Sequence, residues 1–103
     1  MSAEDVAERI RSMEIRGAAE IARRAAQAIK EEAEAYQGTD LKELRSRVER
    51  SRDVLIASRP TAISLWNGVQ YVFKDTSRTA SADEYRSTVI KNADHFVKRS
   101  KNA

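Results

Sequence analysis

The hydrophobic positions along this chain recur every three or four residues, which is the spacing that places them on one face of an α-helix. The alternation of apolar and polar residues typical of strands is absent, and the 103 residues include three glycines and one proline. Five hydrophobic stripes follow one another, separated by polar or helix-breaking residues. The pattern therefore predicts an all-α fold, a compact bundle of about five helices.

Capping residues set the expected bounds of the first two helices. Ser2 and Asp5 have the spacing of a capping pair, so the first helix should begin there and end near residues 15–16. The second should run over about residues 17–37, with Gly38 as its C-terminal cap. The expected buried stripes are Val6, Ile10 and Met13 in the first helix, and Ala18, Ile21, Ala25, Ala28, Ile29, Ala33 and Tyr36 in the second.

The third and fourth helices meet at the single proline. Asp40 is expected to cap the third helix, which should stop at Arg59 because a residue before proline disfavours helical geometry. Pro60 then suits the start of the fourth helix, with Thr61 as its cap. The expected core positions are Leu41, Leu44, Val48, Leu55 and Ile56 in the third helix, and Leu65, Trp66, Val69, Val72 and Phe73 in the fourth.

The last helix is expected to follow a polar loop over residues 75–80. Ser81 and Glu84 have the spacing of a capping box, and the basic segment 98–103 is expected to fray. The buried stripe here comprises Tyr85, Val89, Ala93, Phe96 and Val97. Because the sequence contains no internal repeat or linker, residues 1–103 are predicted to form a single helical domain.

Two segments, residues 13–19 and 58–65, each place an arginine beside a helix junction. A second helix that rises about 30 Å and a third that descends about 26 Å return the chain to its starting level. Arg16 and Arg59 should then lie near the same pole, each at the start of a helix whose first amides lack partners. Two arginines and two helix N-termini at one pole predict an anion-binding site.

The same residues also suit a plain helix junction, in which Gly17 allows a bend, alanines allow close packing and the arginines aid solubility. The residues alone leave both interpretations open. His95, the single histidine, is expected to be a surface residue. The sequence shows no phosphate-binding loop, no dinucleotide fingerprint, no metal-ligand spacing and no complete catalytic apparatus. No catalytic residue, metal site or cofactor is therefore predicted.

Composition narrows the functional classes. The charged fraction is 34%, the mean hydropathy is −0.65, and no apolar run approaches the ~18 residues that a membrane span needs. The absence of cysteine fits a reducing, cytoplasmic compartment and rules out thiolate catalysis by this chain. The net charge is +3, but most basic residues alternate with acidic ones, so a nucleic acid is not the expected partner.

Both arginine segments resemble a known family. Residues 8–18, with Ile21, Ala22 and Arg23, resemble the N-terminal helical domain of archaeal ribose 1,5-bisphosphate isomerases, and residues 59–65 with Asn67 match a second hallmark of that family. The methylthioribose-1-phosphate isomerases and the alpha, beta and delta subunits of translation initiation factor 2B belong to the same superfamily. The similarity extends over essentially the whole chain, but its specific parts are these two motifs.

The resemblance implies roles for particular residues. Arg16, Gly17, Ala18 and Ala19 would line a phosphosugar site, and Arg59 would contact a phosphate. It also implies that the catalytic cysteine and aspartate belong to a C-terminal α/β domain, which this 103-residue chain lacks. Alone, the chain is therefore not expected to isomerise a sugar.

Three functional hypotheses follow. The first is a substrate-phosphate-binding and assembly domain of a sugar-phosphate isomerase. Its partners would be a sugar phosphate, the missing α/β domain or a partner subunit, and further copies of itself in a homo-oligomer. The second is a regulatory or scaffold domain like those of the initiation factor 2B subunits. The third is a plain helical interaction module. Ala19, where family members often have glycine, and Trp66, where they have proline, leave the exact ligand open.

Overall fold

The computed structural model describes residues 2–15, 17–59 and 62–102, and the side chains of these residues up to Ser100. This part of the chain contains no strand, and the expected all-α fold is confirmed. Its elements are α1 (Ala3–Arg11), α2 (Ala18–Ala35), α3 (Leu41–Ser58), α4 (Ile63–Val72), the short 3₁₀ helix η1 (Thr76–Arg78) and α5 (Ala82–Asn102).

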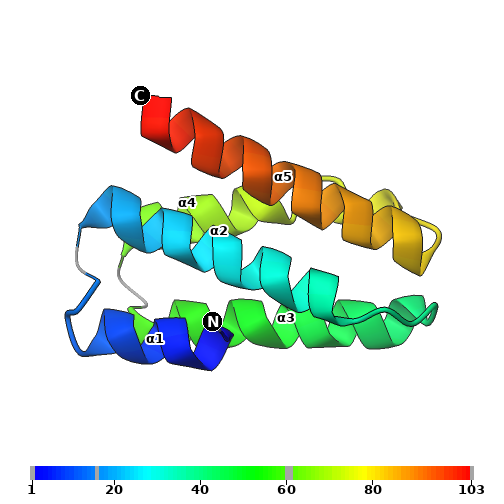
Figure 1. The fold of residues 1–103 in the computed structure, drawn as a ribbon, viewed down its shortest axis with the longest axis horizontal. Helices are drawn as coiled ribbons and strands as arrows, with labels where there is room; N and C mark the ends of the chain where they lie inside the picture. Colours follow the sequence, from blue (N-terminus) through cyan, green and yellow to red (C-terminus); the bar gives the residue numbers. More distant parts are fainter. Residues whose placement is uncertain (1, 16, 60–61, 103) are drawn as a thin grey trace.

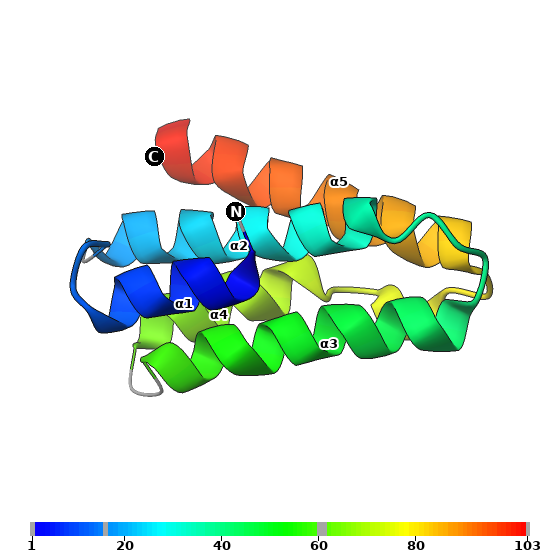
Figure 2. The same cartoon turned by 60° about the horizontal axis from the view of Figure 1, so that its bottom comes forward.

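Helix α2 is the centre of the bundle and packs against each of the other four helices (Figure 1). The chain reverses direction at each connection between helices, as the second view also shows (Figure 2). The starts of α2 and α4 therefore lie at the same end of the bundle, on the left in Figure 1. Helix α2 ends towards the opposite end, where α5 begins, whereas the shorter α4 ends nearer the middle and is followed by the segment that contains η1.

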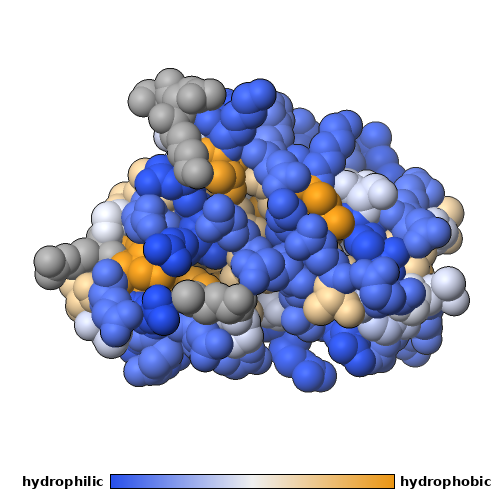
Figure 3. Space-filling model, viewed as in Figure 1, coloured by the Kyte–Doolittle hydropathy of each residue, from blue (hydrophilic) through white to orange (hydrophobic). Residues whose placement is uncertain are grey.

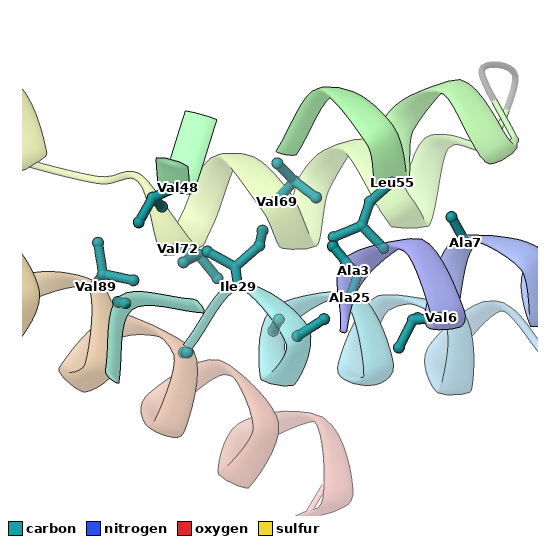
Figure 4. Close-up of a cluster of buried hydrophobic side chains, with 14 of the residues drawn as sticks. Ala3, Val6, Ala7, Ala25, Ile29, Val48, Leu55, Val69, Val72 and Val89 are labelled. Carbon is teal, nitrogen blue, oxygen red and sulfur yellow. The ribbon is translucent and has the colours of Figure 1, made fainter. Parts of the chain in front are cut away.

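The core is built from small and branched side chains of all five helices. Ala25 and Ile29 of α2 lie near Val48 and Leu55 of α3 and Val69 of α4 (Figure 4). The alanines of α2 let its neighbours approach closely, as the stripe predicted. Three expected core residues are wrong: Met13 is 49% exposed, Trp66 is 41% exposed, and Ala18 is exposed. Ala18 and Trp66 lie on the outward faces of α2 and α4, while Met13 lies beyond the end of α1.

Helix α1 ends at Arg11, four residues before the predicted end. Met13 adopts a left-handed conformation with φ of 71°, which a continuing right-handed helix cannot contain. Ile15, beyond this turn, is buried at 6% exposure and its N–H donates to the carbonyl of Arg9 at 3.1 Å. The periodicity predicted one more turn of helix, but the chain instead makes a non-helical turn at Met13 that buries Ile15.

The expected cap at Gly38 is also wrong. Helix α2 ends at Ala35, Tyr36 follows in an extended conformation, and Gly38 has no positive φ. The guanidinium of Arg86 on α5 supplies the missing donors instead. Its Nη2 donates to the carbonyls of Tyr36 at 2.7 Å and Gly38 at 2.9 Å, and its Nε donates to Tyr36 at 3.0 Å and to Ala33 at 3.3 Å.

The other helix starts agree with the sequence except at α4. Ser2 and Asp5 form the predicted capping box of α1, and Asp40 accepts from two amides of α3. The Ser81 hydroxyl accepts from the N–H of Glu84, whose carboxylate accepts from Ala80 rather than from Ser81. Helix α4 begins at Ile63 with Ala62 as N-cap, and the expected cap Thr61 lies, with Pro60, outside the described residues. The segment 75–80, expected to be a polar loop, contains η1. Helix α5 continues to Asn102, and the expected fraying of its end stays a prediction.

Candidate anion-binding site

A pocket of about 260 Å³ opens between the start of α2 and the start of α4. Its lining comes from both segments that the sequence singled out, with Ala18 on one side and Arg59 on the other. The full set is Ala18, Ile21, Arg59, Ala62, Ile63, Ser64 and Leu65. The pocket lies at the end of the bundle where the chain turns from α1 into α2 and from α3 into α4 (Figure 2).

Among the described residues, no side chain caps either of the two helices that begin at this pocket. Gly17 and Ala62 are the N-cap residues of α2 and α4, and neither makes a side-chain hydrogen bond to the first turn. By contrast, Ser2 and Asp40 cap α1 and α3 with side-chain oxygens. The first amides of α2 and α4 therefore keep their donors available, and each helix end carries partial positive charge.

Arg59 supplies the charged group of the pocket. It is the C-cap residue of α3, is partly exposed, and within the described residues forms no ion pair with a carboxylate. Its Nη1 instead donates to the thioether sulfur of Met13 at 3.6 Å. A guanidinium with no acidic partner beside two uncapped helix starts is suited to binding an anion.

The one acidic residue in the first turn of α2 is already neutralised. Glu20 accepts hydrogen bonds from Arg24 at 2.8 Å and from Arg23 at 2.9 Å. These two guanidinium groups, Arg24 first, hold the pKa of the Glu20 carboxyl below its usual range. Two arginine side chains thus accompany the single carboxylate of Glu20, so the N-terminal part of α2 keeps a net positive charge.

Gly17 has no structural need to be glycine within the described residues. Its φ is −74°, and a Cβ built on it would lie 3.7 Å from the Cβ of Glu20, an ordinary contact. Neither the bend nor the packing therefore explains it. Glycine adds no side chain beside the first turn of α2.

The predicted site residues are placed unequally. Gly17, Ala18 and Ala19 are exposed at the start of α2, and Ala18 shares the pocket with Arg59. Arg16 lies outside the described residues. The predicted site did not include five of the lining residues, which are Ile21, Ala62, Ile63, Ser64 and Leu65. Four of them lie in the second arginine segment, but the true start of α4, which determines which of their side chains face the pocket, carried no capping signal.

Other surface features lie outside this pocket. A larger groove of about 540 Å³ runs between α3 and α4 and includes Trp66 and Phe73. His95 is exposed, as expected, and its Nδ1 lies 2.6 Å from the Tyr71 hydroxyl. The face shown in Figure 3 is mostly hydrophilic, with small hydrophobic areas, one of them at the left end of the bundle.

The described residues form neither a metal-binding cluster nor a membrane-spanning helix. No three histidine, aspartate or glutamate side chains in the described part of the chain are grouped so that they could hold a metal ion. None of the helices described is both long enough and apolar enough to cross a lipid bilayer.

The described residues thus form an all-α bundle in which the starts of α2 and α4, with no side-chain cap from those residues, line one pocket with a partly exposed arginine. Comparison with known proteins then identifies its family. A family model described as the Initiation factor 2 subunit family (IF-2B) matches residues 14–103. The chain belongs to this family, and the resemblance that the two arginine segments indicated is confirmed.

The individual relatives are sugar-phosphate isomerases. The chain is 39% identical to the ribose 1,5-bisphosphate isomerase of Pyrococcus furiosus over 96% of its own length and 32% of the relative's. It is 33% identical to the methylthioribose-1-phosphate isomerase of Geobacillus kaustophilus, over 87% of this chain and 25% of that protein. Both are larger proteins, and the chain spans about a third or less of the length of the relatives it matches.

A solved structure shows the same helical arrangement. The crystal structure of 5-methylthioribose 1-phosphate isomerase from Pyrococcus horikoshii OT3 superposes with a TM-score of 0.85 at 25% sequence identity. The match covers 95% of this chain and 28% of that one. The chain is thus similar in sequence and fold to one part of sugar-phosphate isomerases.

Proposed function

We propose that this chain is a substrate-phosphate-binding and assembly domain of a cytoplasmic sugar-phosphate isomerase, most similar to the ribose 1,5-bisphosphate type. The observation that carries the proposal is the pocket itself. Two helix starts and Arg59 line one cavity, and none of the described residues supplies a side-chain cap to these helices or a carboxylate to Arg59. The relatives indicate which anion this is, because the substrates in their names, ribose 1,5-bisphosphate and methylthioribose 1-phosphate, are phosphorylated sugars.

The proposed residue roles follow from their positions. The amides of Ala18 and Ala19 donate to the phosphate oxygens, Gly17 leaves room for the approach, and the Arg59 guanidinium binds the phosphate through its fork of donors. Arg16 completes the site in this proposal. The domain's contribution is to hold and orient the sugar, since fixing a reactant near the catalytic groups removes entropy from the reaction.

The proton transfers of an isomerase require groups that this chain does not provide at the pocket. The sequence has no cysteine, and no histidine or carboxylate lines the cavity among the described residues. We therefore assign the chemistry to an α/β domain or partner subunit outside these 103 residues. The chain acts in this scheme as one domain of a larger assembly.

A titration tests the binding role. Ribose 1,5-bisphosphate should shift the backbone amide resonances of residues 17–20 and 62–65. Arg59→Gln should weaken binding about ten- to a hundredfold, because a hydrogen bond to a charged group contributes about 1.5–3 kcal/mol. Arg78→Gln is the matched control, since Arg78 is an exposed arginine at the opposite end of the bundle. Equal affinities for the two variants would reject the site.

A second candidate is a regulatory or scaffold domain like those of initiation factor 2B subunits. Exposed apolar side chains beside the pocket favour it, because Ile63 is 74% exposed and Trp66 is 41% exposed. Sedimentation of the chain over a range of concentrations distinguishes the candidates. Self-association that Ile63→Ser abolishes, with no amide response to the sugar phosphate, would favour the scaffold.

A further inference from the structure

Met13 has a backbone conformation that is costly for its residue type. Its φ is 71°, and Asp75 is the other non-glycine residue with positive φ among those described. A side chain with a Cβ is disfavoured in this left-handed region, and glycine is the usual residue just after a helix end. The Met13 side chain is nevertheless 49% exposed, so burial does not compensate for the conformation.

Hydrogen bonds on both sides hold Met13 in this turn. Its own N–H donates to the carbonyl of Ile10 at 3.2 Å, and the N–H of Ile15 donates to the carbonyl of Arg9 at 3.1 Å. The side chain of Ile15 is buried and anchors the segment that follows. The direction in which the Met13 side chain leaves the backbone is therefore set by the fold.

That direction brings the sulfur of Met13 to Arg59, which is 46 residues away in sequence. The Arg59 Nη1 donates to the Met13 Sδ at 3.6 Å. A thioether is a neutral, weak acceptor, so it can orient a guanidinium without cancelling its charge. A carboxylate at this position would orient Arg59 equally well, but it would also compete with any anion in the pocket.

We propose that Met13 is the positioning residue of the anion site: its side chain holds the Arg59 guanidinium beside the pocket and leaves the positive charge available to phosphate. This inference rests on the proposed function, since it concerns the same arginine. It explains why a non-glycine residue occupies a left-handed turn at this end of the bundle.

Substitution of Met13 should move stability and affinity in opposite directions. Met13→Gly should raise the midpoint of thermal unfolding by about 4–8 °C, because glycine removes the backbone strain. It should weaken binding of inorganic phosphate, followed by amide chemical shifts, about two- to tenfold, because Arg59 must then be ordered by the ligand. Met13→Glu should weaken phosphate binding further by pairing with Arg59.

Asp75→Gly is the matched control for the backbone effect. Asp75 is the other left-handed residue and follows α4 at the opposite end of the bundle. Its replacement should also raise the unfolding midpoint but leave phosphate affinity unchanged. Loss of phosphate affinity in Asp75→Gly as well would attribute the Met13 effect to backbone strain in general and overturn the positioning role.

A ligand-free measurement separates this inference from the proposed function. The ¹⁵N heteronuclear NOE of the Arg59 Nε–Hε group should report an ordered side chain in the wild type and a mobile one in Met13→Gly. Identical values would overturn the positioning role, as would unchanged phosphate affinity. Wild-type chain that shows no response to phosphate would instead reject the proposed site, whatever the mobility of Arg59.

Discussion

Gly17 occupies the N-cap position of α2 in an extended conformation that any residue can adopt. Serine is a preferred N-cap residue because its hydroxyl accepts a hydrogen bond from an amide of the first turn. Gly17→Ser should therefore stabilise the chain by a few tenths of a kcal/mol and weaken phosphate binding roughly two- to tenfold. The new hydroxyl and the phosphate would compete for the amide of Ala19. Urea denaturation and amide shift titration measure the two effects.

Ser81→Ala is the control for this prediction. The Ser81 hydroxyl accepts from the N–H of Glu84 at the start of α5, far from the pocket. Its loss should cost about 1 kcal/mol of stability without changing phosphate affinity. If Gly17→Ser bound phosphate as tightly as the wild type, the amides of α2 would not be ligands.

The hydroxyl of Tyr85 is buried in the core. Its side chain is fully buried, and its hydroxyl has no hydrogen-bond partner among the described residues. Burial raises the pKa of this hydroxyl from its ordinary value of about 10 to about 12, with Glu49 adding to the rise. A buried hydroxyl without a partner keeps its desolvation cost in the folded state.

Tyr85→Phe should therefore be neutral or stabilising by about 1 kcal/mol at pH 7. Between pH 10 and 12 the unfolded wild-type chain releases the Tyr85 proton, whereas the folded chain keeps it. The free energy of unfolding of the wild type, relative to that of Tyr85→Phe, is therefore constant below pH 10 and falls as the pH rises to about 12, by up to about 3 kcal/mol.

Urea denaturation of the wild type and Tyr85→Phe at several pH values between 7 and 12 tests this account. The difference between the two free energies of unfolding should change across pH 10–12, because the phenylalanine variant lacks this titration. A constant difference would mean that the Tyr85 hydroxyl has a partner in solution.

Among the elements, the C-terminus of α2 depends on a residue of α5. The guanidinium of Arg86 donates to three carbonyls at the end of α2 and in the following turn, and its Nη1 pairs with Asp83 at 2.8 Å. Since the side chain is 14% exposed, its removal would leave carbonyls without donors in a partly dry environment.

Arg86→Ala should lower the free energy of unfolding by about 2–4 kcal/mol, and Arg86→Lys should recover little, because an ammonium cannot reach three carbonyls at once. Thermal unfolding measures both variants. Arg11→Ala is the comparison, since Arg11 pairs with Glu8 on the exposed face of α1 and should cost less than about 0.5 kcal/mol. Similar losses for Arg86→Ala and Arg11→Ala would contradict the capping role.

Arg86 also illustrates which parts of the elements the sequence could predict. Ser2, Asp40 and Ser81 cap helices with their own side chains, so local spacing was sufficient to place those helix starts. The end of α2 was misplaced at Gly38, because its cap comes from α5, 48 residues further along the chain. The residues near the end of α2 do not reveal that a side chain of another helix donates hydrogen bonds to its last carbonyls.

At the scale of the whole molecule, the convergence of the two arginine segments could be predicted from helix lengths. Ala18 and Arg59 line one pocket because α2 and α3 are both 18 residues long and antiparallel. The contact between Met13 and Arg59 could not be predicted, because periodicity extended the first helix through Met13 and assigned its side chain to the core. The helix ends early because the turn at Met13 lets Ile15 be buried, and that burial depends on the other helices of the assembled core.

The packing of α2, α4 and α5 makes a final prediction, because the three helices meet at Gly68. A Cβ at Gly68 would lie 3.1 Å from the Phe96 ring and 3.2 Å from the Cβ of Ala22. Phe96 is partly exposed and can move, but Ala22 is fixed to the backbone of α2. Gly68→Ala should therefore destabilise the chain by about 1–2 kcal/mol despite its better helix propensity. Urea denaturation of Gly68→Ala, Ala22→Gly and the double variant should show that the two changes partly compensate. Strict additivity would mean that α4 can shift away from α2 at no cost.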